Sequence, residues 1–119
     1  MTWTVILVGE VEDWFFGLDP KTADLVAAAI NNLEEYGPTL GRPLVDRVHD
    51  SNLHNLKELR PGSAGDSEVR ILFAFDPQRQ AVLLVGGDKS GRWKDWYKES
   101  IPLAEERFEA WINGYSVER

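Results

Sequence analysis

Residues 69–87 read VRILFAFDPQRQAVLLVGG and hold two apolar runs joined by a short polar turn. Such runs, rich in Val, Leu and Phe on either side of a turn, predict two adjacent antiparallel strands. In the first run Ile71 and Phe73 alternate with Arg70 and Leu72, so the two pairs point to opposite faces of the sheet. We expect Ile71 and Phe73 to face a core beneath helices, and Arg70 to emerge on the other side.

The segments on either side of this hairpin predict a further strand and a long helix. Residues 53–60 end in NLKELR and are predicted as a strand, which the Gly- and Ser-rich loop 61–67 joins to the hairpin. Residues 93–113 place their apolar side chains on one helical stripe. Pro102 lacks a backbone donor, so we expect it to kink or split this helix near Ser100.

The first third of the chain predicts one strand and two helices. Residues 3–8 have the Val, Ile and aromatic content of a strand, and residues 11–18 repeat apolar side chains at helical spacing. Asp19 followed by Pro20 is typical of the start of a second helix, which Gly37 ends. The order of elements predicts an α+β fold, with a small antiparallel or mixed sheet packed against an N-terminal helix pair and a C-terminal helix.

Length and composition predict a single domain, residues 1–119. The chain has 119 residues, of which 43% are hydrophobic, and this is enough for one buried core. It has no cysteine, so neither a disulfide nor a cysteine zinc site is possible, which fits a reducing compartment. No apolar run has the length of a membrane span, and the run at residues 5–8 is too short for a signal peptide. We therefore expect a soluble, cytoplasmic protein.

The net charge of −7 argues against nucleic acid binding over a broad surface, because phosphates attract Lys and Arg. The charges are unevenly distributed, however. Residues 1–41 hold one cation and seven anions, whereas residues 42–104 hold ten cations and nine anions. Any surface that binds RNA must therefore be a local patch in the second region, and the alternative is an ordinary acidic protein with scattered cations.

Cations close to aromatic residues form the candidate patch. The cations of the strands and of the turn after them are Lys57, Arg60, Arg70, Lys89 and Arg92. The aromatic residues that follow are Trp93, Trp96 and Tyr97. A single RNA strand is bound by cations that meet its phosphates and by rings that stack on its bases. The pattern therefore favours RNA as the ligand.

The sequence predicts neither a metal site nor a cofactor. The scattered carboxylates and the two histidines, His49 and His54, lack the spacing of an HExxH or EF-hand motif. The glycines of GGDKSG (86–91) lack the GK[ST] ending of a phosphate loop. Imidazole titrates near neutral pH, so a histidine is a conceivable general acid or base, and His54 is the preferred one.

The ordered set LKELR (56–60), VRILFAF (69–75) and AVLLVGGDK (81–89), followed by a helix with Trp and Tyr, resembles the HigB branch of the RelE/ParE superfamily of type II toxins. The resemblance spans roughly residues 40–112, and GGDKSGRWKDWYKESIPLAE (86–105) is similar to the actinobacterial-type members. It implies a RelE-like fold and a metal-independent endoribonuclease that cleaves mRNA, often on the ribosome. It also implies a partner, the antitoxin encoded beside the toxin, which we expect to be a DNA-binding helix-turn-helix protein.

The resemblance further implies roles for individual residues. Arg70 matches the arginine that the family places on its third strand, and it would contact the scissile phosphate. Lys57 and Arg60 lie in the neighbouring strand, where family members carry basic residues, but alternation places them on opposite faces unless a bulge intervenes. Lys89 would contact the phosphate or the leaving oxygen, and Tyr97 would stack on a base or assist proton transfer. The expected RNA contacts are Arg92, Trp93, Trp96 and His54.

Other interpretations of these residues stay open. Arg70 is also explained as an exposed strand cation paired with Glu58, and Lys57 as a solvated lysine. Tyr97 lies on the apolar stripe of its helix, so a place in the core is equally expected. Trp3, Trp14 and Trp111 are candidates for an antitoxin surface or, more often in a small domain, for the core. The alternative function is a non-nucleolytic relative that acts on a protein, as ParE acts on gyrase.

Overall fold

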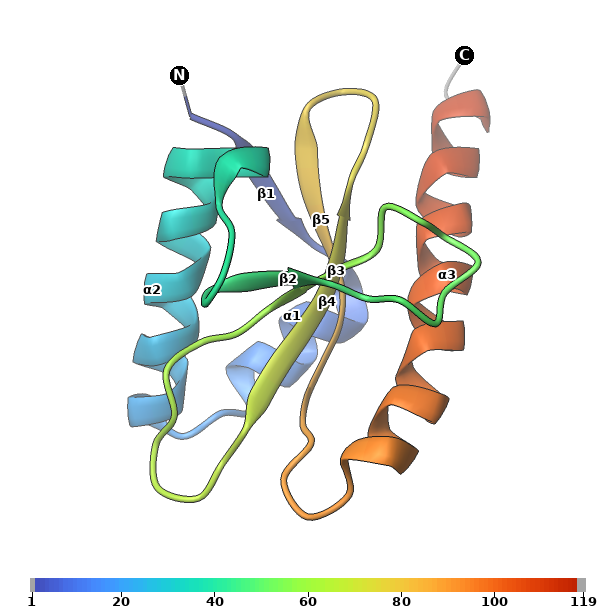
Figure 1. Ribbon diagram of the computed structural model, residues 1–119. Helices are drawn as coiled ribbons and strands as arrows, with labels where there is room; N and C mark the ends of the chain where they lie inside the picture. The colour runs from blue at the N-terminus through green and yellow to red at the C-terminus, as the bar shows by residue number, and fades with distance from the viewer. Residues whose placement is uncertain (1, 118–119) are drawn as a thin grey trace.

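The computed structural model describes residues 2–117 and has the predicted hairpin at the centre of a five-stranded mixed sheet (Figure 1). The strand order is β1-β5-β4-β3-β2, in which β1 runs parallel to β5 and the other neighbours are antiparallel. The strands are β1 (Thr4–Leu7), β2 (Val45–Arg47), β3 (Lys57–Leu59), β4 (Val69–Phe75) and β5 (Gln80–Asp88). The predicted α+β class is confirmed.

Two N-terminal helices, α1 (Gly9–Phe16) and α2 (Pro20–Tyr36), cover one face of the sheet. Their buried side chains pack against Ile71 and Phe73, as the alternation in β4 predicts. Because both strand residues are fully buried, this face supplies much of the hydrophobic stabilisation. A short 3-10 turn, η1 (Gly37–Thr39), follows α2, and Gly37 adopts a φ of 54° that favours glycine.

The start of α2 is fixed by the predicted cap. A side-chain oxygen of Asp19 accepts a hydrogen bond from the backbone N–H of Thr22 at 3.1 Å, and Pro20 occupies the first helical position. We expect Asp19→Ala to lower the free energy of unfolding by about 1 kcal/mol, because one helix donor loses its acceptor. Urea denaturation measures this change. Asp24→Ala, on the exposed side of the same helix, is the control, and an equal loss in both variants would contradict a capping role.

The third helix, α3 (Trp93–Val117), covers the opposite face of the sheet. Of the two expected effects of Pro102, a split is excluded because α3 is unbroken, whereas a kink agrees with the change of direction that the ribbon shows after its first turns in Figure 1. Pro102 and Lys98 are both exposed. The Lys98 carbonyl that Pro102 leaves without a donor is therefore accessible to water, and the helix continues.

Two glycines at the end of β5 make room for tryptophan side chains on opposite faces of the sheet. A Cβ at Gly86 would lie 2.4 Å from the Trp14 ring, and one at Gly87 would lie 2.4 Å from the Trp96 ring nitrogen. These glycines therefore serve packing. Among the described helices, none combines the length and apolar character needed to cross a membrane.

Candidate functional site

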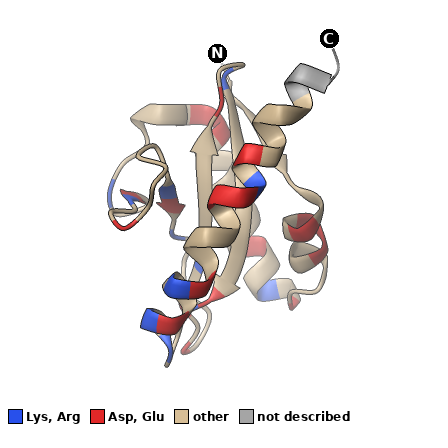
Figure 2. Cartoon of the chain, turned by 90° about the vertical axis from the view of Figure 1, so that its right-hand side faces the viewer, with Lys and Arg blue, Asp and Glu red and all other residues tan. Residues whose placement is uncertain are grey.

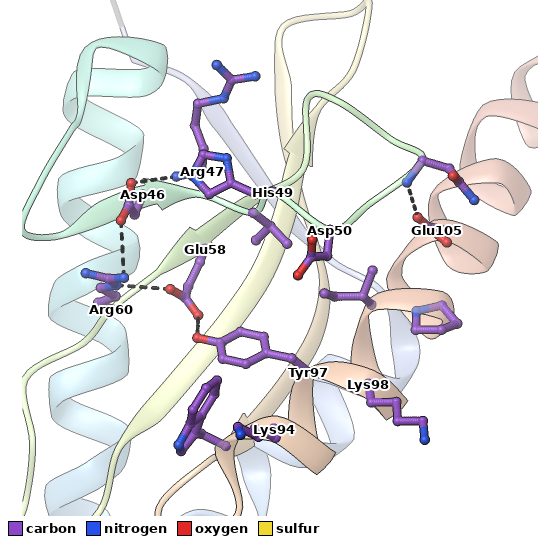
Figure 3. A pocket seen from close by; sticks show the side chains of 15 residues that line it. Asp46, Arg47, His49, Asp50, Glu58, Arg60, Lys94, Tyr97, Lys98 and Glu105 are labelled. Atoms are coloured by element: carbon purple, nitrogen blue, oxygen red, sulfur yellow. Dashed lines mark hydrogen bonds and ion pairs between the residues drawn. The ribbon is translucent and has the colours of Figure 1, made fainter.

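A cavity of about 740 Å³ lies between the segment that begins at β2 and the first half of α3 (Figure 3). Acidic and basic side chains line it in equal number, together with aromatic rings and one histidine. The acidic residues are Asp46, Asp50, Glu58 and Glu105, and the basic residues are Arg47, Arg60, Lys94 and Lys98. The aromatic residues are Trp93 and Tyr97, and the histidine is His49. Figure 2, which faces α3, shows the same mixture of signs at its first turns.

Among the residues that line the cavity, Glu58 is the centre of the polar contacts, and its side chain is only 4% exposed. The guanidinium of Arg60 lies 3.0 Å from Oε2, and Nε of Arg70 lies 3.9 Å from Oε1. The Tyr97 hydroxyl donates a hydrogen bond to Oε1. A buried carboxylate is strongly destabilising unless it has such partners, so these four residues, the Glu58 cluster, form one electrostatic unit.

Asp46 on β2 extends the Glu58 cluster along the cavity wall (Figure 3). Its Oδ2 lies 3.3 Å from the guanidinium of Arg60, and its Oδ1 accepts a hydrogen bond from the Arg47 backbone N–H at 2.9 Å. This backbone hydrogen bond, helped by the charges of Arg42 and Arg60, lowers the pKa of Asp46 below its ordinary value. Asp46 and Glu58 thus hold Arg60 through two different nitrogens of its guanidinium.

Arg70 emerges on the α3 side of the sheet, as its place in the alternation predicts. Its side chain is only 16% exposed, so its pairing with Glu58 is a nearly buried one instead of the exposed pair that the sequence suggested. One terminal nitrogen donates to the Val69 carbonyl at 2.8 Å. The buried Nε has no hydrogen-bond partner among the residues that the structure describes. Arg70 therefore keeps an uncommitted donor beside Glu58.

Lys89 lies over the ring of Tyr97. Its Nζ is 5.9 Å from the centre of the Tyr97 ring and 3.7 Å from a carboxylate oxygen of Glu68. Tyr97 is half-buried and lines the cavity, whereas Lys89 and Arg70 lie beside the cavity without lining it. The fold thus brings together four of the five residues predicted as catalytic, namely Arg60, Arg70, Lys89 and Tyr97.

The fifth, Lys57, lies elsewhere, and its assignment to this site is wrong. Its Nζ lies 5.5 Å from the centre of the Phe75 ring, on the face of the sheet that α1 and α2 cover. The pairing of β3 with β4 runs through Lys57 and Glu58 without a bulge, so these neighbours point to opposite faces. Lys57 and Arg60 therefore cannot act on one substrate group.

The two tryptophans predicted as RNA contacts, Trp93 and Trp96, lie in different environments. Trp93, which was placed on the apolar stripe, is 54% exposed and lines the cavity. Trp96 is 5% exposed and packs edge-on against Tyr97, with ring centres 5.1 Å apart, so it cannot offer a face to a base. Of the two rivals, Trp93 is the one available for stacking.

The remaining predicted RNA contacts, Arg92 and His54, lie outside the lining of the cavity. Arg92 is exposed and paired with Glu99 at 2.8 Å, next to the start of α3. His49 lines the cavity, whereas His54, the histidine that the sequence favoured, is exposed and does not line it. No group of three or more His, Cys, Asp or Glu side chains suited to a metal occurs among the described residues.

Trp3, Trp14 and Trp111 are partly buried and serve packing. Trp3 packs edge-on against Phe75, and Trp14 fills the space over Gly86. The ring nitrogen of Trp111 donates to Asp76 at 2.9 Å. The core interpretation of these tryptophans therefore fits the structure.

Burial raises the pKa of the Tyr97 phenol above its ordinary range, and the hydrogen bond and charge of Glu58 raise it further. We expect an absorbance titration to show one tyrosine that ionises above the ordinary phenol pKa of about 10. Because the folded state holds this proton more tightly, its stabilising effect is complete below that pH and is lost as the pH rises above it. This tyrosine ionisation step at high pH, the high step, should vanish in Tyr97→Phe and persist in Tyr36→Phe. A high step that survives Tyr97→Phe would refute the assignment.

Comparisons with known proteins agree with this fold. Residues 13–109 match the family described as phage derived protein Gp49-like (DUF891). HigB3 of Mycobacterium tuberculosis, named as a toxin, is 59% identical over 108 residues, which cover 91% of this chain and 92% of HigB3. HigB2 of the same organism, also named as a toxin, is 59% identical over 101 residues, which cover 85% of this chain and half of HigB2.

A solved structure supports the fold independently of sequence. A mutant of the E. coli toxin RelE in the free state superposes with a TM-score of 0.61 at 9% sequence identity. The match covers 86% of this chain and 97% of that structure. At this identity the likeness concerns the fold alone, and it confirms the RelE-like arrangement of sheet and helices.

Proposed function

This chain belongs to the Gp49-like family and to the HigB-type toxins of the RelE/ParE superfamily, and from this premise we propose that it is an endoribonuclease that cleaves mRNA. The observation that carries the proposal is that Arg60 and Arg70 pair with Glu58, which also binds the Tyr97 hydroxyl, while Lys89 lies over the Tyr97 ring beside a cavity. Cations gathered around one half-buried tyrosine suit a reaction at a phosphate group.

The proposed reaction is attack of a ribose 2′-hydroxyl on the adjacent phosphorus, which releases the 5′-oxygen of the next nucleotide. Negative charge grows on the non-bridging oxygens, and the Arg70 guanidinium, whose buried Nε has no hydrogen bond among the described residues, would turn toward the cavity to stabilise it. Lys89 faces Tyr97 and would serve the leaving oxygen. Trp93 would stack on a base, a contact that is worth about 1–3 kcal/mol.

We further propose that the substrate is mRNA held by a translating ribosome in the cytoplasm. A chain with a net charge of −7 gains little from general attraction to phosphates, so a scaffold that presents the RNA would assist it. The toxin family implies a cognate antitoxin. We propose a helix-turn-helix antitoxin whose basic segment docks on the acidic helices α1 and α2.

Induced expression in a bacterial host, followed by mapping of new RNA 5′-ends, tests the proposal. We expect growth arrest together with new ends inside translated frames. Arrest without new ends would contradict cleavage and favour the alternative, a toxin that acts on a protein target such as gyrase. That alternative draws support from the carboxylates that line the cavity, since they repel RNA phosphates.

A further inference from the structure

The proposed attack requires an acceptor for the proton of the 2′-hydroxyl. Tyr97 is poorly suited to accept it alone, because its phenol is protonated at neutral pH and its raised pKa keeps it so. Its O–H, however, already points at a carboxylate oxygen of Glu58. Both side chains line the same cavity (Figure 3). The phenol oxygen can therefore accept a hydrogen bond from the 2′-hydroxyl, and Glu58 can accept the phenol proton.

We propose that Glu58 positions Tyr97 as a hydrogen-bond acceptor for the ribose 2′-hydroxyl and takes up the tyrosine proton as attack proceeds. The 2′-proton moves to the phenol oxygen while the phenol proton moves to Oε1 of Glu58. The bond from O2′ to phosphorus forms, and the bond from phosphorus to O5′ breaks with its electron pair left on O5′. The Lys89 ammonium protonates O5′, so the products are a 2′,3′-cyclic phosphate and a 5′-hydroxyl. This inference rests on the proposed function.

The surroundings of Glu58 are suited to such a role. Arg60 holds Oε2 at 3.0 Å and is itself held by Asp46 at 3.3 Å, so the carboxylate plane is fixed from one side. Arg70 lies 3.9 Å from Oε1, the oxygen that Tyr97 contacts, and its Nε makes no hydrogen bond to the described residues. The donor of Arg70 can therefore turn to the phosphate as charge develops there, which leaves Oε1 free to bind the proton.

The groups around Glu58 come from three strands of the sheet and from α3. Asp46 on β2 holds Arg60, which follows β3, and both Arg60 and Arg70 on β4 pair with Glu58. Tyr97 on α3 donates a hydrogen bond to the same carboxylate. Glutamine at position 58 keeps the shape of the side chain but cannot take up the tyrosine proton, so we expect the cleavage rate to fall.

Single-turnover cleavage of an RNA oligonucleotide tests the proposal, with circular dichroism to confirm folding. The variants are Glu58→Gln, Glu58→Asp, Tyr97→Phe and the double variant Glu58→Gln/Tyr97→Phe. Glu106→Gln, an exposed carboxylate on α3, is the control. We expect Glu58→Gln and Tyr97→Phe each to lower the rate by about 100-fold or more, and Glu58→Asp to restore part of it. RNA affinity should change by much less than the rate.

Non-additivity is the decisive result. If the two residues act as one unit, the double variant loses no more rate than either single variant. A rate loss in the double variant that equals the product of the two single losses would overturn the proposal. Wild-type rates in a folded Glu58→Gln variant would overturn it as well. If Glu58→Gln does not fold, the cleavage rates of Glu58→Asp, Tyr97→Phe and the Glu58→Asp/Tyr97→Phe double variant are the test, and a double-variant loss equal to the product of the two single losses would overturn the proposal.

A second measurement separates this inference from the proposed function. Absorbance titration of Glu58→Gln should move the high tyrosine step downward, since the carboxylate contributes to it and the readout needs no cleavage. An unmoved step would refute positioning of Tyr97 by Glu58. Absence of cleavage by the wild-type protein would overturn the proposed function and the proton transfer together, while a moved step would still establish the positioning.

Discussion

Arg70→Ala is expected to lower the rate of RNA cleavage by about 100-fold to 1,000-fold, the usual effect of removing one preorganised donor from a charged transition state. Arg70 is the cation with an uncommitted buried donor, and it lies 3.9 Å from Glu58 in the Glu58 cluster. No other described cation contacts the same carboxylate oxygen. Single-turnover kinetics, and the number of new 5′-ends after induced expression, measure the loss.

Two variants separate this loss from general effects of charge and stability. Lys57→Ala removes an equal charge from the neighbouring strand on the other face, and it should leave the rate unchanged. Arg70→Lys keeps the charge but loses the planar fork, and it should recover only part of the rate. Full activity in a folded Arg70→Ala variant would refute the role of Arg70 at the phosphate. Equal losses in Arg70→Ala and Lys57→Ala would refute the placement of the site.

Phe73→Ala is expected to lower the free energy of unfolding by about 3–5 kcal/mol, a large part of the stability of a domain of this size. Phe73 has no exposed surface and packs edge-on against Phe75, with ring centres 5.5 Å apart, in the core under α1 and α2. Its removal leaves a cavity between the central strand and these helices. Urea denaturation followed by circular dichroism gives the change directly.

Phe16→Ala is the matched control, because the same substitution is made at a side chain that is 75% exposed. It should change the free energy of unfolding by no more than about 0.5 kcal/mol. A small effect at Phe73 would mean that the sheet and the helices pack less closely than the structure shows. A large effect at Phe16 would mean that its surface is covered by another molecule in solution.

Local pattern was sufficient to predict the hairpin, the cap of α2 and the face of Arg70. Strand alternation has a period of two, so the side chain of a strand residue follows from its position alone. The same rule excluded Lys57 from the face of Arg60. A family resemblance favoured both residues, and in this case the geometry of the strand gave the better answer.

The Glu58 cluster could not be predicted, because it depends on how α3 lies across the sheet. The sequence showed Glu58 only as one possible partner of Arg70, and nothing local indicates that Tyr97 reaches the same carboxylate. The place of the histidines has a similar cause. Glu105 on α3 accepts hydrogen bonds from Ser51 and from the Asn52 backbone, and these contacts set the course of the loop that carries His49 and His54.

The apolar stripe predicted for α3 differs from the structure at the first residue of the helix. Trp93 is the first residue of the helix and lies beyond the part that packs on the sheet, whereas Trp96 lies over Gly87. A helical period predicts which residues share a face, but it does not say where along the helix the contact begins. Only the tertiary packing decides that point.

The parallel pairing of β1 with β5 sets the order in which the chain can fold. Thr4 pairs with Gln80 and Leu7 with Leu83, so β1 has no partner strand until most of the polypeptide has been made. The β4 and β5 hairpin, by contrast, closes a short loop, and loop closure favours such local pairs early. We therefore expect a folding nucleus at the hairpin, with β1 added last. Pulse-labelled hydrogen exchange during refolding should show amides of β4 protected before those of β1.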